Sequence, residues 1–211
     1  MSWSKKPGHR RGYHHGNLRE ALIEAALSLI AEKGPAGFSF AEAARAAGVT
    51  PAAPYRHFRD RDALMADVAR RGFETLTVRL AEGWNDGKPE PRGAFDALGR
   101  AYLAFARDKP AYYVAMFESQ LPHDQHPELA RASDAAFNVL RRAAETVTAT
   151  LPEQGRPPAL MVALHMWSMA HGIAALFARG DTGRRPLPMA PEALLEAATL
   201  VYFQGLESGA H

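Results

Sequence analysis

The stretch Gly48-Val-Thr-Pro-Ala-Ala-Pro-Tyr-Arg-His-Phe-Arg-Asp-Arg-Asp-Ala-Leu64 decides the interpretation of this sequence. Before it, Ser39-Phe-Ala-Glu42 has the spacing of a capping box, which predicts a short helix beginning there. Within it, Thr50-Pro51 supplies an N-cap and a proline at the first helical position, which predicts a second very short helix ending near His57. Two short helices separated by a tight turn at Gly48 are typical of a helix-turn-helix, in which the second helix lies in the major groove of DNA.

The side chains of the second short helix suit contact with DNA. The hydroxyl of Thr50 can meet a phosphate at the helix N-terminus. The small side chains of Ala52 and Ala53 allow close approach and can touch thymine methyl groups. Hydrogen-bonding groups follow on Tyr55, Arg56 and His57, and Arg59 and Arg61 extend the basic surface. The alternative is that Tyr55 and Phe58 fill a small core and the arginines are solvated; we favour packing for Phe58 and DNA contact for Tyr55, Arg56 and His57.

The rest of the sequence also reads as helical, because its apolar residues recur at helical spacing and no segment alternates with period two between hairpin turns. A long helix is expected from Arg61 to about Asp86. Further helices are expected at 91–108, 110–119, 127–151, 157–179 and 191–204, and each of these ranges opens with proline. We therefore predict an all-α chain of about nine helices: an N-terminal three-helix bundle with the helix-turn-helix, followed by a larger helical domain.

The quoted stretch resembles the recognition region of the TetR family of transcriptional regulators, in which Gly-Val-Ser-x-Gly-x-x-Tyr-x-x-Phe leads to Lys-x-x-Leu. Gly48, Val49, Tyr55, Phe58 and Leu64 match that pattern, with Thr50 at the serine position and Arg61 at the lysine position. Ala52 departs from the usual glycine and Pro54 from an apolar residue. Upstream, residues 22–34 are similar to the first helix of the family, so the resemblance covers about residues 10–70.

The resemblance implies a homodimer whose two recognition helices bind a palindromic operator in double-stranded DNA. It assigns DNA contact to Ser39, Thr50, Ala52, Ala53, Tyr55, Arg56, His57 and Arg61. Together with the glycine-rich, basic composition of the first residues, it suggests three parts: a flexible basic arm at 1–16, the helix-turn-helix domain at 17–62, and a helical ligand-sensing and dimerisation domain at 63–211.

The charge distribution supports a polyanionic partner for the N-terminal part. The net charge of +2 is divided unevenly, since residues 1–59 hold nine Lys+Arg and four Asp+Glu. Part of that excess lies in an arm with Lys5, Lys6, His9, Arg10, Arg11, His14 and His15. Two interpretations of the arm stay open: it follows the phosphate backbone or a minor groove, or it is a solvated tail.

The C-terminal part suits an apolar binding cavity. Two consecutive predicted helices carry several aromatic residues, and methionines that repack easily accompany them. Candidate ligand-binding residues are Tyr102, Phe105, Tyr112, Tyr113, Met116, Phe117, Trp167 and His171. An ordinary helical core would also use these residue types, and we prefer that alternative for any single aromatic side chain.

The motif Trp167-Ser-Met-Ala-His171-Gly172 places Trp167 and His171 on one helix face, because they are four residues apart. It resembles a C-terminal domain of some TetR-like regulators that is named for its Trp, His and Gly. That resemblance implies a ligand-sensing and dimerising domain. A histidine satisfied inside the core is the competing interpretation for His171.

The segment Ala159–Ala178 is nearly all apolar over the length of a membrane span. We favour a helix buried in the protein or at a subunit interface, and expect no membrane association. Small residues (Gly172, Ala174, Ala175) together with Leu194, Leu195, Ala198 and Val201 predict a four-helix interface between two subunits. The basic N-terminus lacks the apolar core of a signal peptide, so we expect a cytoplasmic protein.

The sequence thus favours a transcriptional regulator, most simply a repressor released from its operator by a small-molecule effector. An activator or an effector-independent repressor of the same fold is an alternative. A small helical enzyme or metalloprotein is a weaker one. The chain has no cysteine, its close histidine pairs (His14-His15 and His123-x-x-His126) have few carboxylates nearby, and it lacks a His-Glu-x-x-His motif, a phosphate loop and a nucleophile elbow. We expect no catalytic residue, metal or cofactor.

Overall fold

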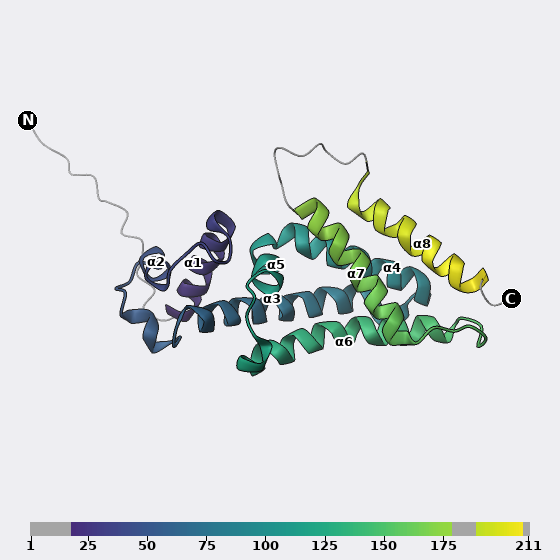
Figure 1. Ribbon diagram of the computed structural model, residues 1–211, viewed down its shortest axis with the longest axis horizontal. Coiled ribbons are helices and arrows are strands. Elements are labelled where there is room, and N and C mark those ends of the chain that lie inside the picture. The colour runs from purple at the N-terminus through teal and green to yellow at the C-terminus, as the bar shows by residue number, and fades with distance from the viewer. Residues whose placement is uncertain (1–17, 179–188, 209–211) are drawn as a thin grey trace, which may run out of the picture.

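The computed structural model describes residues 18–178 and 189–208, and every regular element in these two ranges is helical (Figure 1). The elements are α1 (Leu18–Lys33), α2 (Phe40–Ala46), the 3-10 helix η1 (Ala53–Arg56), α3 (Arg61–Trp84), η2 (Asn85–Gly87), α4 (Pro91–Asp108), α5 (Pro110–Phe117), η3 (His123–Gln125), α6 (Pro127–Ala149), α7 (Ala159–Ala178) and α8 (Pro191–Ser208). The prediction of an all-α fold is confirmed. The predicted basic arm lies outside the described residues.

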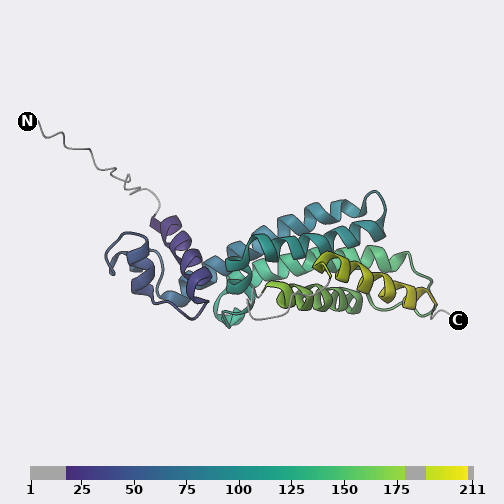
Figure 2. The ribbon, with the colours of Figure 1, turned by 90° about the horizontal axis from the view of Figure 1, so that it is seen from above.

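The head of the molecule consists of α1, α2 and η1 and lies at one end (Figures 1 and 2). Helix α3 begins in the head and runs into the body, where it packs against α4, α5 and α6. Buried side chains form one continuous core from the head, with Leu22 and Phe58, through α3 to Leu140 and Val162 in the body. The head and the body are therefore joined by packing as well as by the chain.

Local sequence signals set the helix ends. The side chain of Asp60 accepts a hydrogen bond from the backbone N–H of Ala63 at 2.8 Å and caps α3. At the other end of α3, Asn85 adopts a left-handed conformation with φ of 44° and stops the helix. Four helices begin with proline, whose missing N–H costs nothing at a first helical position: Pro91, Pro110, Pro127 and Pro191.

The second helix of the helix-turn-helix differs from the prediction. We expected it to run from Thr50 to about His57, whereas residues 51–52 form a turn and only Ala53–Arg56 form a 3-10 helix. Pro54 has no N–H to donate to the carbonyl of Thr50, which instead accepts from the N–H of Ala53 at 3.0 Å. The departure of Pro54 from the family pattern thus shortens and tightens this element.

The predicted capping box is present at α2. The hydroxyl of Ser39 accepts from the N–H of Glu42, and the N–H of Ser39 donates to the Glu42 carboxylate at 2.8 Å. The ammonium of Lys33 donates to the same carboxylate at 2.9 Å. These hydrogen bonds, with that of Lys33 the strongest, lower the pKa of Glu42 from 4.5 to about 2.

The capping box predicts a pH dependence of stability. Because the pKa of Glu42 is lowered on folding, its carboxylate stabilises the fold above pH 4.5, and that contribution is lost as the pH falls through about 2. Glu42→Gln is expected to be less stable than the parent at pH 6, with the difference shrinking towards pH 2. Urea unfolding of parent and variant at several pH values measures the difference in free energy of unfolding. Glu82→Gln, which removes an exposed carboxylate from α3, serves as control. A difference between Glu42→Gln and the parent that does not change with pH would contradict the lowered pKa of Glu42.

Candidate functional site

The segment from Thr50 to His57 presents a row of exposed side chains on the head, with Pro54 buried beneath them. Thr50, Ala52, Arg56 and His57 are exposed and Ala53 is half-buried. Tyr55 is 62% exposed, and its ring meets Phe40 edge to face at 5.0 Å between centroids. The ring is therefore held in place while the surface around it stays open. The structure brings together the residues that the sequence predicted for this row.

Phe58 and Arg61 have internal roles. Phe58 is 5% exposed, as the packing interpretation predicted, and the guanidinium of Arg19 lies over its ring at 5.2 Å. Arg61 donates from Nε to the carbonyl of Phe38 at 2.9 Å and from a terminal nitrogen to the carbonyl of Pro35. Arg61 thus ties the start of α3 to the loop before α2.

Ser39 is likewise engaged within the head, because its hydroxyl belongs to the capping box. Most of the positive charge predicted for the N-terminal part does not lie in the exposed row. Residues 18–59 hold five Lys+Arg and four Asp+Glu, so most of the N-terminal excess belongs to Lys5, Lys6, Arg10 and Arg11, which lie outside the described residues. Within the row, Arg56 is the one charged residue, and Arg59 adds a second positive charge just after it.

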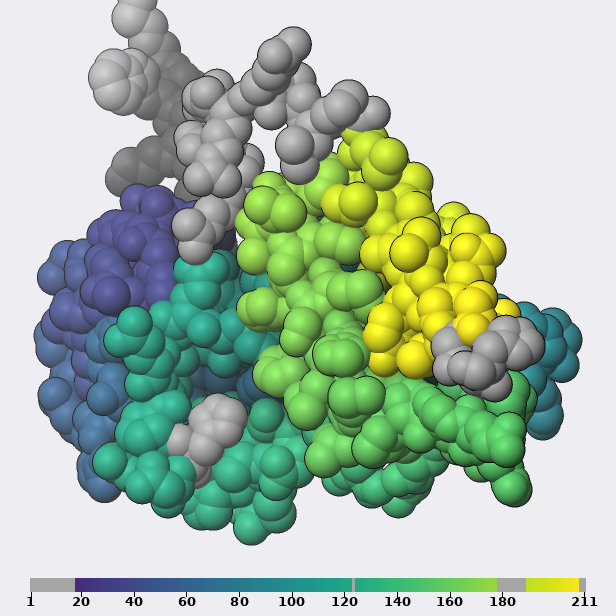
Figure 3. Space-filling view, turned by 45° about the vertical axis from the view of Figure 1, so that its right-hand side comes forward, coloured from purple at the N-terminus to yellow at the C-terminus, as the bar shows by residue number. Residues whose placement is uncertain are grey.

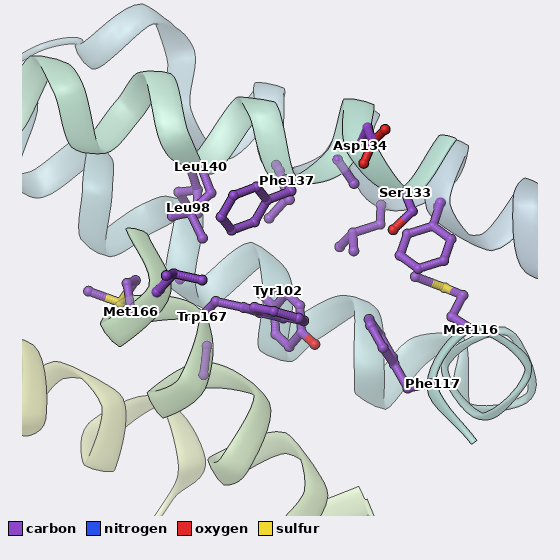
Figure 4. A pocket seen from close by; sticks show the side chains of 17 residues that line it. Leu98, Tyr102, Met116, Phe117, Ser133, Asp134, Phe137, Leu140, Met166 and Trp167 are labelled. Carbon is purple, nitrogen blue, oxygen red and sulfur yellow. The ribbon is translucent and has the colours of Figure 1, made fainter. Parts of the chain in front are cut away.

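A cavity of about 330 Å³ lies in the body between α3, α4, α5, α6 and α7 (Figure 4). Its walls are mostly apolar and aromatic: Phe73, Leu76, Leu80, Leu98, Gly99, Tyr102, Met116, Phe117, Ser133, Asp134, Ala136, Phe137, Leu140, Leu164, Met166, Trp167 and Ala170. Figure 4 shows Leu98, Leu140 and Met166 towards one end, and Ser133, Asp134 and Met116 towards the other. The cavity is therefore apolar at one end and carries polar groups at the other.

Half of the eight predicted ligand-binding residues line the cavity: Tyr102, Met116, Phe117 and Trp167. Tyr113 and His171 lie directly behind them. Phe105 is fully buried elsewhere, with Arg79 over its ring at 6.0 Å. Tyr112 faces the charges of Glu24 and Arg71, and burial raises the pKa of its hydroxyl.

His171 supports the aromatic wall of the cavity. Its Nδ1 lies 2.8 Å from the hydroxyl of Tyr102 and 3.1 Å from that of Tyr113. Its ring stacks on Tyr113 and meets Phe117 edge to face at 4.8 Å between centroids. Burial lowers the pKa of His171 from 6.5, although Glu118 opposes this, so the ring is neutral at neutral pH. An unprotonated Nδ1 can accept from both hydroxyls, and burial raises the pKa of Tyr102 well above its usual range.

Sequence reasoning missed the walls that α3 and α6 supply. Phe73, Leu76 and Leu80 recur at helical spacing on α3, and Phe137 and Leu140 do so on α6. Periodicity therefore marked them as inward-facing, but it could not separate cavity walls from closed core. The one local sign of a cavity on α6 was the pair of polar residues Ser133 and Asp134 beside that apolar stripe.

The outer surfaces of α7 and α8 form an exposed apolar face, where the two helices lie side by side (Figure 3). Its large side chains are exposed: Leu160, Met161, Leu164, Leu176, Leu200 and Val201. Gly172 is exposed in the middle of α7 with nothing within 4 Å of the position of a Cβ. Of the residues predicted for an interface, Ala174 and Leu195 instead pack inside the subunit. Among the described helices, α7 has the length and composition to cross a membrane over Ala159–Phe177, and a third of that stretch is buried.

Two family models match the chain. The one described as "Bacterial regulatory proteins, tetR family" matches residues 22–68, and "Tetracyclin repressor-like, C-terminal domain" matches residues 95–202. YobS of Bacillus subtilis (strain 168), described as an uncharacterized HTH-type transcriptional regulator, is 27% identical over 167 residues, which are 78% of this chain and 81% of YobS.

Solved structures share the fold. A protein of unknown function from Rhodococcus sp. RHA1 has a TM-score of 0.76 and 31% identity, covering 94% of this chain and 100% of that one. AibR in complex with isovaleryl coenzyme A and operator DNA has a TM-score of 0.68 and 18% identity, covering 87% of this chain and 97% of that one.

Proposed function

The chain belongs to the TetR family of helix-turn-helix transcriptional regulators, and on this premise we propose that it is a homodimeric repressor released from a palindromic operator by a small-molecule effector. The observation that carries the proposal is the combination of an exposed recognition row on the head with an apolar cavity in the body, joined by α3. We divide the chain into an arm (1–16), a DNA-binding domain (17–62) and a sensing and dimerisation domain (63–211), working in the cytoplasm.

In this proposal the DNA contacts come from Thr50, Ala52, Ala53, Tyr55, Arg56 and His57, whose side chains form the row. Arg56 is the candidate for a bidentate hydrogen bond to guanine, because a guanidinium fits the O6 and N7 acceptors. Ser39 and Arg61, whose hydrogen bonds lie within the head, would act by positioning the row.

The effector would occupy the cavity and act on the head through α3 and α5. Helix α3 lines the cavity and continues into the head, and α5 lines it with Met116 and Phe117 while packing against α1. A ligand that binds unequally to two arrangements of these helices shifts their populations, and with them the separation of the two recognition rows. AibR, which shares the fold, was solved with both a small molecule and operator DNA.

Selection of the preferred DNA from a random pool, using the full-length protein, tests the proposal. We expect enrichment of an inverted repeat whose half-sites lie about one helical turn apart, ~34–36 Å. Enrichment of no sequence would overturn DNA-binding regulation. In vitro transcription from a promoter carrying that repeat then separates a repressor from the alternative of an activator. A screen for compounds that release the protein from the DNA then distinguishes an effector-controlled repressor from an effector-independent one.

The exposed face of α7 and α8 is proposed as the dimer interface. Val201 is 68% exposed in the single subunit, so a charge there would be buried twice in a two-fold symmetric dimer. Val201→Glu is expected to raise the dimer dissociation constant at least about tenfold, which sedimentation velocity across a concentration series measures. Val78→Glu is the matched control, because Val78 is an exposed valine on α3. A parent protein that is monomeric at micromolar concentration would contradict the proposal.

A further inference from the structure

The charge composition of the cavity is one-sided. Of the described residues that line it, Asp134 alone is charged, and none is lysine, arginine or histidine. We infer that the cavity takes an organic cation: an apolar body that carries an ammonium group, rather than an apolar acid. This inference rests on the proposed effector role of the cavity.

The apolar part of such a ligand fits the end lined by Leu98, Leu140 and Met166. A volume of about 330 Å³ corresponds to about eleven waters at their liquid density. That space suits a molecule of a similar number of non-hydrogen atoms, such as a phenyl ring with a short alkyl chain. Burial of such a body against leucine and aromatic walls supplies the non-specific part of the affinity.

The polar end favours a positive group for two reasons. First, Asp134 stands at this end next to Ser133; its side chain is exposed to solvent, and among the described residues it forms no ion pair. The nearest arginine on its own helix, Arg131, pairs with Glu128 instead. Second, the rings of Phe117, Tyr102 and Trp167 line the same cavity, and aromatic faces attract cations.

An anionic ligand meets the opposite situation. Its carboxylate would lose water, would find no positive partner among the described lining residues, and at the polar end would lie near the exposed carboxylate of Asp134. His171, which stands behind the aromatic wall, does not supply one, because burial lowers its pKa and its Nδ1 lies against the hydroxyls of Tyr102 and Tyr113. The cavity therefore discriminates by charge as well as by shape.

The test uses three probes with one carbon skeleton: 4-phenylbutylamine, 4-phenylbutan-1-ol and 4-phenylbutanoate. Calorimetric titration into the full-length protein is expected to show binding of the alcohol and about tenfold tighter binding of the amine than of the carboxylate. Asp134→Asn is expected to bring that ratio close to one. Glu145→Gln removes another carboxylate from α6, one that pairs with Arg141 outside the cavity, and is expected to leave the ratio at its parent value.

Each outcome has a defined meaning. If the alcohol binds but the amine and the carboxylate bind equally, or the carboxylate binds more tightly, the charge inference is wrong and the effector cavity stands. A tenfold ratio that survives in Asp134→Asn also overturns the role of Asp134. If none of the three probes binds, the inferred ligand class is wrong, and the effector role is decided by the screen for compounds that release the DNA. The uncharged alcohol reports in each variant whether the cavity is intact.

Discussion

Replacing Tyr55 and Arg56 together with alanine is expected to lower affinity for the selected operator by more than about 100-fold. Each guanidinium that reads a guanine contributes about 1–3 kcal/mol, and a dimer carries two. Two losses of at least about 1 kcal/mol lower the operator affinity by about 30-fold or more. The loss of the two tyrosine hydroxyls adds to this. Fluorescence anisotropy with labelled operator and with a scrambled duplex measures it. The scrambled duplex is expected to lose much less, because phosphate contacts supply non-specific binding.

The controls separate base reading from charge and from folding. Arg59→Ala removes a charge three residues away, where Arg59 is exposed and pairs with Asp60, and is expected to weaken both duplexes slightly and about equally. The double variant Tyr55→Phe with Arg56→Ala keeps the ring contact with Phe40, so the head retains that packing. Full operator affinity in this second variant would sink the assignment of the recognition row.

Replacing Asp67 with asparagine is expected to lower the free energy of unfolding by about 2–3 kcal/mol. The carboxylate is 6% exposed and meets Arg19 of α1 at 3.0 Å, Arg70 at 2.7 Å and Arg71 at 3.6 Å. Removing one partner of a buried ion pair costs about 3–5 kcal/mol, and the expected value is lower here because the arginines keep contact with solvent. Urea unfolding followed by tryptophan fluorescence, at one protein concentration, measures the loss.

The matched control is Glu74→Gln. Glu74 is the other carboxylate partner of Arg70, but it is 54% exposed, so its loss is expected to cost less than about 0.5 kcal/mol. Equal effects of the two substitutions would show that burial of Asp67 does not matter. Since Arg19 belongs to the head, Asp67→Asn is also expected to speed amide exchange in α1 relative to α6.

The order and extent of the helices were predictable because their signals are local. Asp60, Asn85 and the prolines that open four helices act within one turn of where they stand. The exposed row on the head was predictable for a similar reason, since its residues are nearly consecutive. Its conformation was not, because Pro54 replaces one hydrogen-bonding pattern with another that the motif does not encode.

The sites that depend on distant packing were predicted less well. Tyr112 and Tyr113 are adjacent in the sequence, yet one faces the ion pairs of α1 and α3 and the other contacts His171. The orientation of each side chain depends on packing against helices that are distant in the sequence. The same applies to Arg61, whose donors are taken by the carbonyls of Pro35 and Phe38, and to Leu195, which turned inward where an interface residue was expected.

In the proposed operator complex, the shortness of η1 limits how many base pairs one subunit can read. A 3-10 helix rises about 2.0 Å per residue, so its four residues span about 8 Å, little more than two base-pair steps of about 3.4 Å. Each half-site then offers only a few base pairs that side chains read directly. The rest of the specificity for one operator in a genome must come from the spacing of the two half-sites and from the deformability of the DNA between them.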